Sequence, residues 1–453
     1  MDTKKLRQKI LDLAIRGKLV PQDPNDEPAS VLLERIRAEK EQLIKEGNIK
    51  RTKKSNASDT SHYENVPFEV PENWEWIKLG ECGDVITGMT PSKDNKLYYG
   101  GKIPFYKPTD LEQGEYTLYS SDTLSTLGFS QCRQLPCNSI LVTCIGATIG
   151  KTGIIKSRGA CNQQINAIVP YCFLNYQYLY YVCVSNYMQT EIRDNSSSTT
   201  LPILNKSKFS ELMIPLPPLN EQFRIIRAVK DILLEIENLD RERHNLRNQI
   251  HNIKNLVIEL AISGKLVPHK PLDEPATELL RRINPNYTPC DNRHYEQLPN
   301  SWEEVELGDV CQLFDGEKVR GKEFINLDVK YLRGFKEGSR LSSGKYVPEN
   351  ALMILVDGEN SGEVFTTPHE GYQGSTFKQL RISSELNRDY VLLLIQRSHE
   401  LLKDNKVGSA IPHLNKKLFK QIHVPIPPYD EQIRIVRAVQ DAMNKLDDIL
   451  ADL

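Results

Sequence analysis

A glycine-rich segment in the first half of the chain resembles a phosphate-binding loop. Gly146-Ala-Thr-Ile-Gly150-Lys151-Thr152 could place backbone N–H groups and a lysine around phosphates, but three residues separate its two glycines, whereas the motif has four. The matching segment in the second half runs from Gly358 to Glu363 and has no Lys-Thr pair. We therefore predict a turn in a β domain at both places.

A second motif, Pro427-Pro428-Tyr429, resembles the Asn/Asp-Pro-Pro-Tyr active-site motif of amino-methyltransferases. Ile426 stands where that motif needs a polar acceptor, so the chemistry is missing. The equivalent pair in the first half is Pro217-Pro218. Because proline presets φ for the first turn of a helix, both pairs predict the start of a helix.

No other pattern indicates catalysis. Asp315-Gly-Glu317-Lys318 comes nearest to the carboxylate-plus-lysine core of a nuclease, and a surface turn is the better interpretation. The sequence has no glycine-rich strand-turn-helix for S-adenosylmethionine, no metal-ligand spacing among its nine histidines and no Cys-x-x-Cys pair among its nine cysteines. We expect no catalytic residue, no metal and no cofactor bound by this chain.

Composition places the 453-residue chain among soluble globular proteins of two to four domains. Its apolar runs are far shorter than a membrane helix, and its N-terminus is polar, so we expect no membrane span, no secretory signal and a cytoplasmic location. The 58 basic and 60 acidic residues give a net charge of −2. Binding to nucleic acid would therefore depend on a local concentration of basic groups.

Three blocks of sequence occur twice, which predicts a two-copy architecture. The offset shrinks from 247 to 228 to 210 residues along the chain, so the copies share a frame and differ in their interiors. The first block ends in Gly-Lys-Leu-Val-Pro, the second contains Trp-Glu-x-x-x-Leu-Gly, and the third contains Leu-Asn-Lys followed by Pro-x-Pro-Pro-x-x-Glu-Gln. Their members begin at Leu11 and Ile258, at Pro71 and Pro299, and at Leu204 and Leu414.

Apolar residues after each Pro-Pro pair recur in alternating steps of four and three, which is the seam of a coiled coil. The central seam has one polar exception, Arg243, and its period holds for about five heptads. Its other members are Ile225, Val229, Ile232, Ile236, Leu239, Leu246, Ile250, Ile253, Val257 and Leu260. The C-terminal copy supplies Ile435, Val439, Ala442, Leu446, Ile449 and Leu453, and the N-terminal copy supplies Leu6, Ile10 and Leu13.

The offsets indicate a cyclic repeat that is cut within one of its two long helices. Leu453 corresponds to Arg243 and Met1 to Asn248, so the two chain ends together rebuild nearly all of the central helix. We therefore expect the ends to lie close together. The fold class is α+β, with two globular, mixed α/β and β-rich domains separated by two long antiparallel coiled-coil helices in a pseudo-two-fold cyclic repeat.

Six regions follow from this pattern. The insertion at 37–65 has no counterpart in the second half, so it is interpreted as a charged helix extension with a polar linker. The remaining regions are an N-terminal repeated helical region at 1–36, a first variable domain at 66–216, a central repeated region with the long helix at 217–284, a second variable domain at 285–426 and a C-terminal repeated helix at 427–453.

The ordered set of repeated motifs resembles the specificity subunit of Type I restriction-modification enzymes over essentially the whole chain. The resemblance implies that the variable domains are target recognition domains, which read double-stranded DNA, and that the helices recruit two modification (methyltransferase) subunits and, through the assembled complex, restriction (translocase-nuclease) subunits. Catalysis is implied to belong to those partners, which use S-adenosylmethionine, ATP and magnesium. This chain would then be a non-catalytic part of a host defence system.

The physical arrangement suits such a task. A central helix of about 45 residues is roughly 65 Å long, comparable to some 20 base pairs at about 3.4 Å each. The helix could therefore set the distance between two half-sites. Because the variable domains differ in length and sequence, the two half-sites should differ as well, giving an asymmetric bipartite target.

DNA-contacting candidates are basic residues for phosphates and polar residues for bases, with arginine suited to guanine. In the first domain they are Lys93, Lys96, Lys107, Lys151, Lys156, Gln163, Gln164, Ser197 and Ser198. In the second domain they are Lys318, Arg320, Lys322, Arg333, Lys336, Thr376 and Lys378.

Three other functions fit parts of the pattern. The chain could be the recognition subunit of a related methyltransferase-nuclease system, or a coiled-coil adaptor that joins proteins and has no DNA specificity. An autonomous methyltransferase is disfavoured by the missing cofactor motifs. Salt-dependent DNA affinity discriminates a DNA reader from an adaptor.

Overall fold

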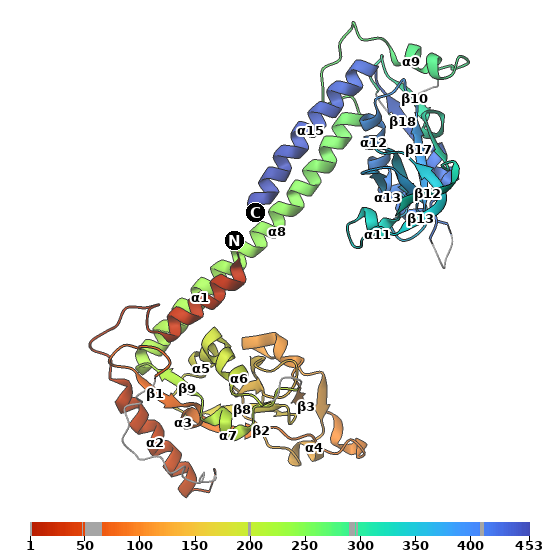
Figure 1. Cartoon of the computed structure of the whole chain (residues 1–453). Helices are drawn as coiled ribbons and strands as arrows, with labels where there is room; N and C mark the ends of the chain where they lie inside the picture. Colours follow the sequence, from red (N-terminus) through yellow and green to blue (C-terminus); the bar gives the residue numbers. More distant parts are fainter. Residues whose placement is uncertain are drawn as a thin grey trace. The chain divides into compact units, whose positions relative to one another are not determined.

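The computed structural model describes residues 2–47, 49, 66–197, 201–289, 295, 298–407 and 412–453. The chain forms two compact units, Met1–Glu242 and Arg243–Leu453. Each unit combines a helical frame with a domain of helices and sheets, as Figure 1 shows. The mixed helix and sheet content predicted from the sequence is confirmed. No helix in the described part of the chain is long and apolar enough to cross a membrane.

One helix of 44 residues, α8 (Leu219–Ile262), contributes residues to both units. It is about 66 Å long at about 1.5 Å per residue. It begins directly after Pro218, and α15 (Tyr429–Asp452) begins directly after Pro428, which is its N-cap residue. Both predictions of a helix start after a Pro-Pro pair are confirmed.

In the first unit, α1 (Thr3–Ile15) packs antiparallel to α8. Arg7 forms an ion pair with Asp240 at 3.5 Å. Gln22, which follows α1, donates a hydrogen bond to Glu221 near the start of α8 at 2.6 Å. The direction of α1 is therefore opposite to that of α8.

In the second unit, α15 packs antiparallel to the last part of α8. Asp447, near the end of α15, is paired with Lys254 of α8. Glu431, near the start of α15, contacts His269, which lies beyond the end of α8. Met1 lies outside the described residues, so the predicted proximity of the chain ends stays a prediction.

The buried face of these helices is broader than the predicted seam. Some seam residues are buried or half-buried, whereas Leu239, Leu246, Ile253 and Ile449 are 38 to 47% exposed. A second stripe, absent from the predicted seam, is buried against each domain and consists of Leu11, Ala14 and Ile15 on α1 and Ile258, Ala261 and Ile262 on α8. The buried seam residues are Ile225, Val229, Ile236, Ile250, Ile435 and Val439; the half-buried ones are Leu6, Ile10, Leu13, Ile232, Val257, Leu260, Ala442, Leu446 and Leu453.

The first domain is closed at its base by an antiparallel pair of strands, β1 (Glu75–Lys78) and β9 (Met213–Leu216). Between them lie a four-stranded sheet of order β2-β8-β5-β6 and a three-stranded sheet of order β4-β3-β7. The strands are β2 Gly83–Thr87, β3 Tyr99–Tyr106, β4 Asp122–Leu124, β5 Ile140–Thr143, β6 Thr152–Ile154, β7 Ala160–Cys161 and β8 Ile165–Pro170. The helices are α3 Leu79–Cys82, η1 Lys96–Tyr98, η2 Asp110–Tyr116, α4 Thr126–Ser130, α5 Tyr176–Val184, α6 Asn186–Asp194 and α7 Lys206–Ser210.

The second domain repeats this plan. The pair β10 (Glu303–Glu306) and β18 (His423–Ile426) closes it, and it contains a four-stranded sheet of order β11-β17-β14-β15 and a closed arrangement of β12, β13 and β16. The strands are β11 Cys311–Phe314, β12 Lys318–Leu327, β13 Arg340–Val347, β14 Leu352–Leu355, β15 Val364–Thr366, β16 Gly371–Gln373 and β17 Phe377–Ile382. The helices are α10 Leu307–Val310, α11 Val329–Leu332, α12 Arg388–Arg397, α13 His399–Asp404 and α14 Lys416–Gln421.

One helix of the frame differs in length between the units. In the first unit, α2 (Ala29–Lys45) has 17 residues, whereas its counterpart α9 (Ala276–Ile283) has eight. The extra turns of α2 fall where the sequence predicted a helix extension. Residues 50–65, which include the predicted polar linker, lie outside the described residues.

Candidate nucleic-acid interface

The segment that resembles a phosphate-binding loop is a β-turn region in both domains. In the first domain it joins the antiparallel strands β5 and β6, whereas a phosphate-binding loop leads from a strand into a helix. Gly146 and Gly150 have φ values of 100° and 87°, and the equivalent Gly358 and Gly362 have 110° and 102°. These positive values favour glycine, so the two glycines are explained by the turn, as predicted.

The repeated Glu-Gln pair after each Pro-Pro turn has a structural role that the sequence did not reveal. Gln222 is buried; its Nε2 donates to the Pro217 carbonyl at 3.0 Å and its Oε1 accepts from the backbone N–H of Asn175 at 3.1 Å. Gln432 makes the same two bonds in the second unit, to Pro427 and Asn387. The glutamine therefore ties each domain to the start of its helix.

The glutamate of the pair is buried in both units and, in the first unit, is bonded to the tryptophan that opens the domain. Glu221 accepts hydrogen bonds from Trp74 Nε1 at 2.9 Å and from Gln22 Nε2 at 2.6 Å. Burial raises the pKa of Glu221, and the hydrogen bonds from Trp74 and Gln22 only partly oppose that increase. In the second unit, Glu431 is bonded to His269 at 2.6 Å. These buried contacts belong to the frame.

Two basic candidates of the first domain, Lys93 and Lys96, lie exposed before β3 and form no ion pair with any described residue. Lys156 lies over the rings of Tyr116 and Tyr176, at 5.1 and 5.4 Å from the ring centroids. Partial burial lowers the pKa of Lys156. Lys93 and Lys96 are therefore the two of these three that are free to contact a phosphate without losing a partner.

Two other candidates are engaged within the first domain. Lys107 is paired with Asp122, and Lys151 is paired with Glu112 at 2.8 Å. Asp122 is the first residue of β4, and Glu112 lies in η2, between β3 and β4. A phosphate would have to compete with a carboxylate for these ammonium groups.

The polar candidates of the first domain gather near one end of its four-stranded sheet. Gln163 is exposed and accepts a hydrogen bond from the Thr90 hydroxyl, and Gln164 is half-buried, with its amide held by an asparagine two residues earlier. Ser197 is exposed, and Ser198 lies outside the described residues. The structure thus brings Gln163 together with Thr90, which the sequence did not single out.

In the second domain, Lys318, Arg320 and Lys322 follow one another on β12 at every second position. All three are exposed, and none forms an ion pair within the described part of the chain. Since side chains two residues apart in a strand point to the same side, Lys318 and Arg320 share one face. A register shift follows Arg320, so this rule does not extend to Lys322. These three residues form the largest group of free cations among the candidates.

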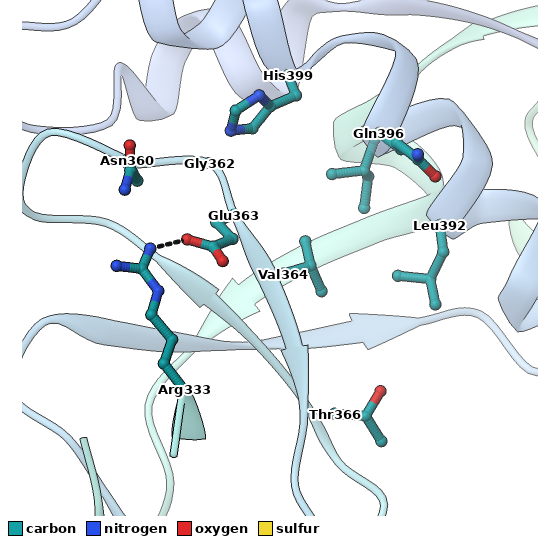
Figure 2. Close-up of a pocket in the computed structure, with 10 residues that line it drawn as sticks. Arg333, Asn360, Gly362, Glu363, Val364, Thr366, Leu392, Gln396 and His399 are labelled. Atoms are coloured by element: carbon teal, nitrogen blue, oxygen red, sulfur yellow. Dashed lines mark hydrogen bonds and ion pairs between the residues drawn. The ribbon is translucent and has the colours of Figure 1, made fainter. Parts of the chain in front are cut away.

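Two further candidates of the second domain are paired. Lys336 forms an ion pair with Asp328 at 2.6 Å, and Arg333 forms one with Glu363. Figure 2 shows the Arg333–Glu363 pair at the wall of a pocket of about 620 Å³ between β15 and the helices α12 and α13. His399 lines the same pocket. The guanidinium of Arg333 is thus occupied by an internal carboxylate.

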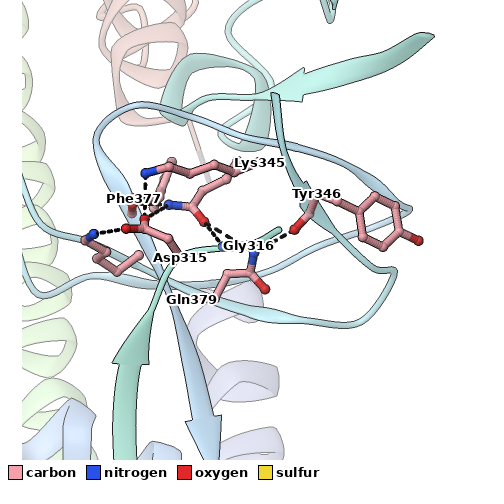
Figure 3. Close-up of polar contacts among 8 residues, drawn as sticks. Asp315, Gly316, Lys345, Tyr346, Phe377 and Gln379 are labelled. Atoms are coloured by element: carbon pink, nitrogen blue, oxygen red, sulfur yellow. Dashed lines mark hydrogen bonds and ion pairs between the residues drawn. The ribbon is translucent and has the colours of Figure 1, made fainter. Parts of the chain in front are cut away.

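Asp315, the nearest approach to a nuclease carboxylate, is the centre of an internal network (Figure 3). It accepts hydrogen bonds from Lys345 at 2.8 Å and Gln373 at 3.0 Å, and it is also paired with Lys378. Burial acts to raise its pKa, but the donors outweigh burial and hold the pKa of Asp315 well below the ordinary value. Thr376, two residues before Lys378, is half-buried. Its carbonyl accepts a hydrogen bond from the backbone N–H of Val356, which follows β14. The described residues contain no group of three metal-ligating side chains.

Comparison with known proteins agrees with the resemblance seen in the sequence. Residues 71–246 and 299–452 match the family described as "Type I restriction modification DNA specificity domain". The chain is 26% identical to the Type I restriction enzyme EcoAI specificity subunit of Escherichia coli, covering 98% of this chain and 90% of that protein. It is 24% identical to the EcoEI specificity subunit of Escherichia coli, covering 99% and 90%.

Solved structures share the fold. The HsdS subunit from Thermoanaerobacter tengcongensis aligns with a TM-score of 0.52 at 16% identity, over 84% of this chain and 92% of that one. A chain from a structure of complex assembly and conformational transition of the type I R-M system aligns with a TM-score of 0.57 at 16% identity, over 85% and 94%. With the family match covering both domains, the chain belongs to the Type I restriction-modification DNA specificity family.

Proposed function

We propose that this chain is the sequence-specific DNA-binding specificity subunit of a Type I restriction-modification enzyme. The observation that carries this function is the duplicated plan: two domains whose four-stranded sheets have matching strand order and whose surface residues differ, each closed by a strand pair and each attached to one long helix. Such a chain presents two different reading surfaces on a single frame. The relatives named above are restriction enzyme specificity subunits, which favours DNA reading over a coiled-coil adaptor.

Each target recognition domain reads one half of an asymmetric bipartite site in this proposal. The frame, with α8 at about 66 Å, sets the spacing between the half-sites. The antiparallel packing of α1 and of α15 on α8 supports a pseudo-two-fold frame in which the chain ends complete the second long helix.

The helices also dock two modification subunits, and restriction subunits join through the assembled complex. Apolar side chains that remain exposed on α8 support this docking, because exposed apolar groups on a helix are typical of a surface that a partner protein covers. They include Leu234, Leu239, Leu246, Ile253 and Leu256. Adenine methylation with S-adenosylmethionine and ATP- and magnesium-dependent cleavage belong to those subunits, and the complex acts in the cytoplasm.

Domain exchange tests the proposal. Replacing residues 71–215 by the corresponding domain of a relative is expected to change one half-site and leave the other intact, because β1 and β9 close the domain on the unchanged frame. The recognised site is determined by methylome sequencing of cells that carry the chimera and the partner subunits. A change in both half-sites, or in neither, contradicts the proposal; the unmodified chain with the same partners is the control.

A further inference from the structure

The segment formed by β12, β13 and the residues that connect them is the most strongly basic part of the second domain. Residues 318–347 contain eight basic and three acidic side chains, a net charge of +5, in a chain whose net charge is −2. The equivalent segment of the first domain, residues 99–124, contains two basic and four acidic side chains, a net charge of −2. The two segments are equivalent because β3 and β12 each pair with the next strand antiparallel and with a later strand in parallel.

β12 and β13 form a two-stranded antiparallel ribbon with one basic face. Arg320 lies opposite Ser343, and Lys318 lies opposite Lys345. Directly opposite residues of an antiparallel pair point to the same side, so these four side chains share a face. Arg320, Ser343 and Lys318 are exposed, and neither Arg320 nor Lys318 has an ion-pair partner within the described residues.

The other face of the ribbon is packed against the domain. Gly344 lies so close to Tyr372 that an added Cβ would be 2.6 Å from the ring. Tyr346, two residues after Gly344, lies opposite Tyr372, and the Tyr372 hydroxyl donates to the Lys322 carbonyl at 2.7 Å. The basic face is therefore the one directed away from the domain.

The base of the ribbon is fixed by the Asp315 network of Figure 3. Lys345 on β13 is bonded to Asp315, which directly precedes the ribbon, and the buried Gln379 donates to the Tyr346 carbonyl at 2.8 Å. Gln373 accepts from the backbone N–H of Gly316 at 3.2 Å. These bonds hold both strands at their root, so the ribbon is ordered before any ligand binds, which lowers the entropic cost of binding.

We propose that the β12–β13 ribbon enters the major groove of the second half-site, with Arg320 bonded to a guanine and with Lys318 and Lys322 on the flanking phosphates. This inference rests on the proposed function and names the reading element. The major groove is wide enough for a two-stranded ribbon, and arginine binds O6 and N7 of guanine bidentately. In the first domain the equivalent segment is acidic and Lys107 is already paired with Asp122. The two domains therefore read DNA with different elements.

The first experiment measures DNA affinity of the complex assembled from the full chain and its modification subunits, at several salt concentrations. Lys318→Ala and Lys322→Ala are each expected to weaken binding to every duplex and to reduce the slope of log K against log salt by about 0.9. Arg320→Ala is expected to lose roughly 10- to 100-fold for the natural site and to relax discrimination at one base pair of the second half-site. Lys270→Ala, between α8 and α9, and Lys102→Ala, on β3, are matched exposed controls and should leave recognition of the second half-site unchanged.

The second experiment tests the groove. Replacing the guanine of the second half-site by 7-deazaguanine removes the N7 acceptor and should weaken the unaltered complex roughly 10-fold. The Arg320→Ala complex should lose little further, so the two changes are not additive. Thermal unfolding of each variant confirms that these exposed substitutions leave the fold intact.

Three results would overturn the ribbon proposal while leaving the proposed function standing: additive losses in the 7-deazaguanine cycle, a second half-site without guanine, or ribbon variants that bind and discriminate as the unaltered complex does. Variants that weaken subunit assembly and not DNA binding would assign the ribbon to an acidic protein partner and also overturn it. Failure of the unaltered complex to bind any sequence specifically would instead remove the proposed function itself.

Discussion

Trp74 Nε1 donates a hydrogen bond to Glu221 Oε2 at 2.9 Å, between two buried residues that are 147 positions apart. The bond joins the opening of the first domain to the start of α8. The equivalent residues of the second unit, Trp302 and Glu431, are also buried, but the Trp302 indole N–H has no hydrogen-bond partner within the described residues. The two copies thus share the same pair of residues and differ in one bond.

This difference predicts unequal effects of the same substitution. Trp74→Phe removes a hydrogen bond to a buried carboxylate and should destabilise its unit by about 1–3 kcal/mol more than the loss of ring volume alone. Trp302→Phe is the matched control, since it removes similar volume and no bond. Urea unfolding followed separately for each unit measures both; equal losses would contradict the assignment.

The pH dependence of the first unit follows from Glu221. Burial raises the folded-state pKa of Glu221 above its ordinary value, so the folded state binds a proton more readily than the unfolded state. The stability from this group is therefore fully present below the unfolded-state pKa and is lost as pH rises through the raised folded-state pKa. Comparing the unfolding midpoints of the unaltered chain and Glu221→Gln from about pH 4 to pH 8 isolates the effect. If the unfolding midpoint of the unaltered chain increased relative to that of Glu221→Gln as pH rises, the predicted direction of the pH effect would be wrong.

The purified chain alone should transfer no methyl group, cleave no DNA and hydrolyse no ATP. The glycine-rich segment is a β-turn, the Pro-Pro pair starts a helix, and Asp315 is held by two lysines and a glutamine. Labelled methyl transfer, nicking and phosphate release measure the three activities. Any of them above the level of a mock purification, without partner subunits, would contradict the prediction.

A circular permutant tests the composite helix. Joining the chain ends through a short polar linker and reopening the chain at Gly47 should give a protein that folds, assembles with its partners and keeps its target. Gly47 follows α2, has a φ of 77°, and an added Cβ there would meet no atom within 4 Å, so this position is uncrowded. The same cut without joined ends is the control. Loss of assembly in the permutant alone would mean that the ends do not meet.

Sequence alone predicted what depends on local or repeated patterns. The seam and the Pro-Pro pairs predicted α8 and α15 because a periodic pattern and a fixed φ act over neighbouring residues. The sequence analysis missed the stripe of Ile258, Ala261 and Ile262. A coiled-coil seam predicts one partner helix, whereas this part of α8 packs both on α15 and on the second domain. The Glu-Gln pair was visible twice, and that repetition was the signal from which its buried role could have been suspected.

The candidate site was harder to predict because charge availability is a property of the fold. Lys107 and Lys151 look like free cations in the sequence, yet their carboxylate partners lie 15 and 39 positions away. Lys318, Arg320 and Lys322 look the same and stay free on β12. Only the positions of the carboxylates in the folded chain distinguish these two groups.

The strand pairs β1–β9 and β10–β18 make each reading domain a closed loop with adjacent ends. The loops span residues 79–212 and 307–422, which are 134 and 116 residues. Because the entropy of closing a loop depends on the logarithm of its length, this difference changes the cost by only about 0.1 kcal/mol. Insertions and recombination events inside a loop can therefore accumulate without straining the frame, so selection for new DNA targets and selection for subunit assembly can proceed independently in the same gene.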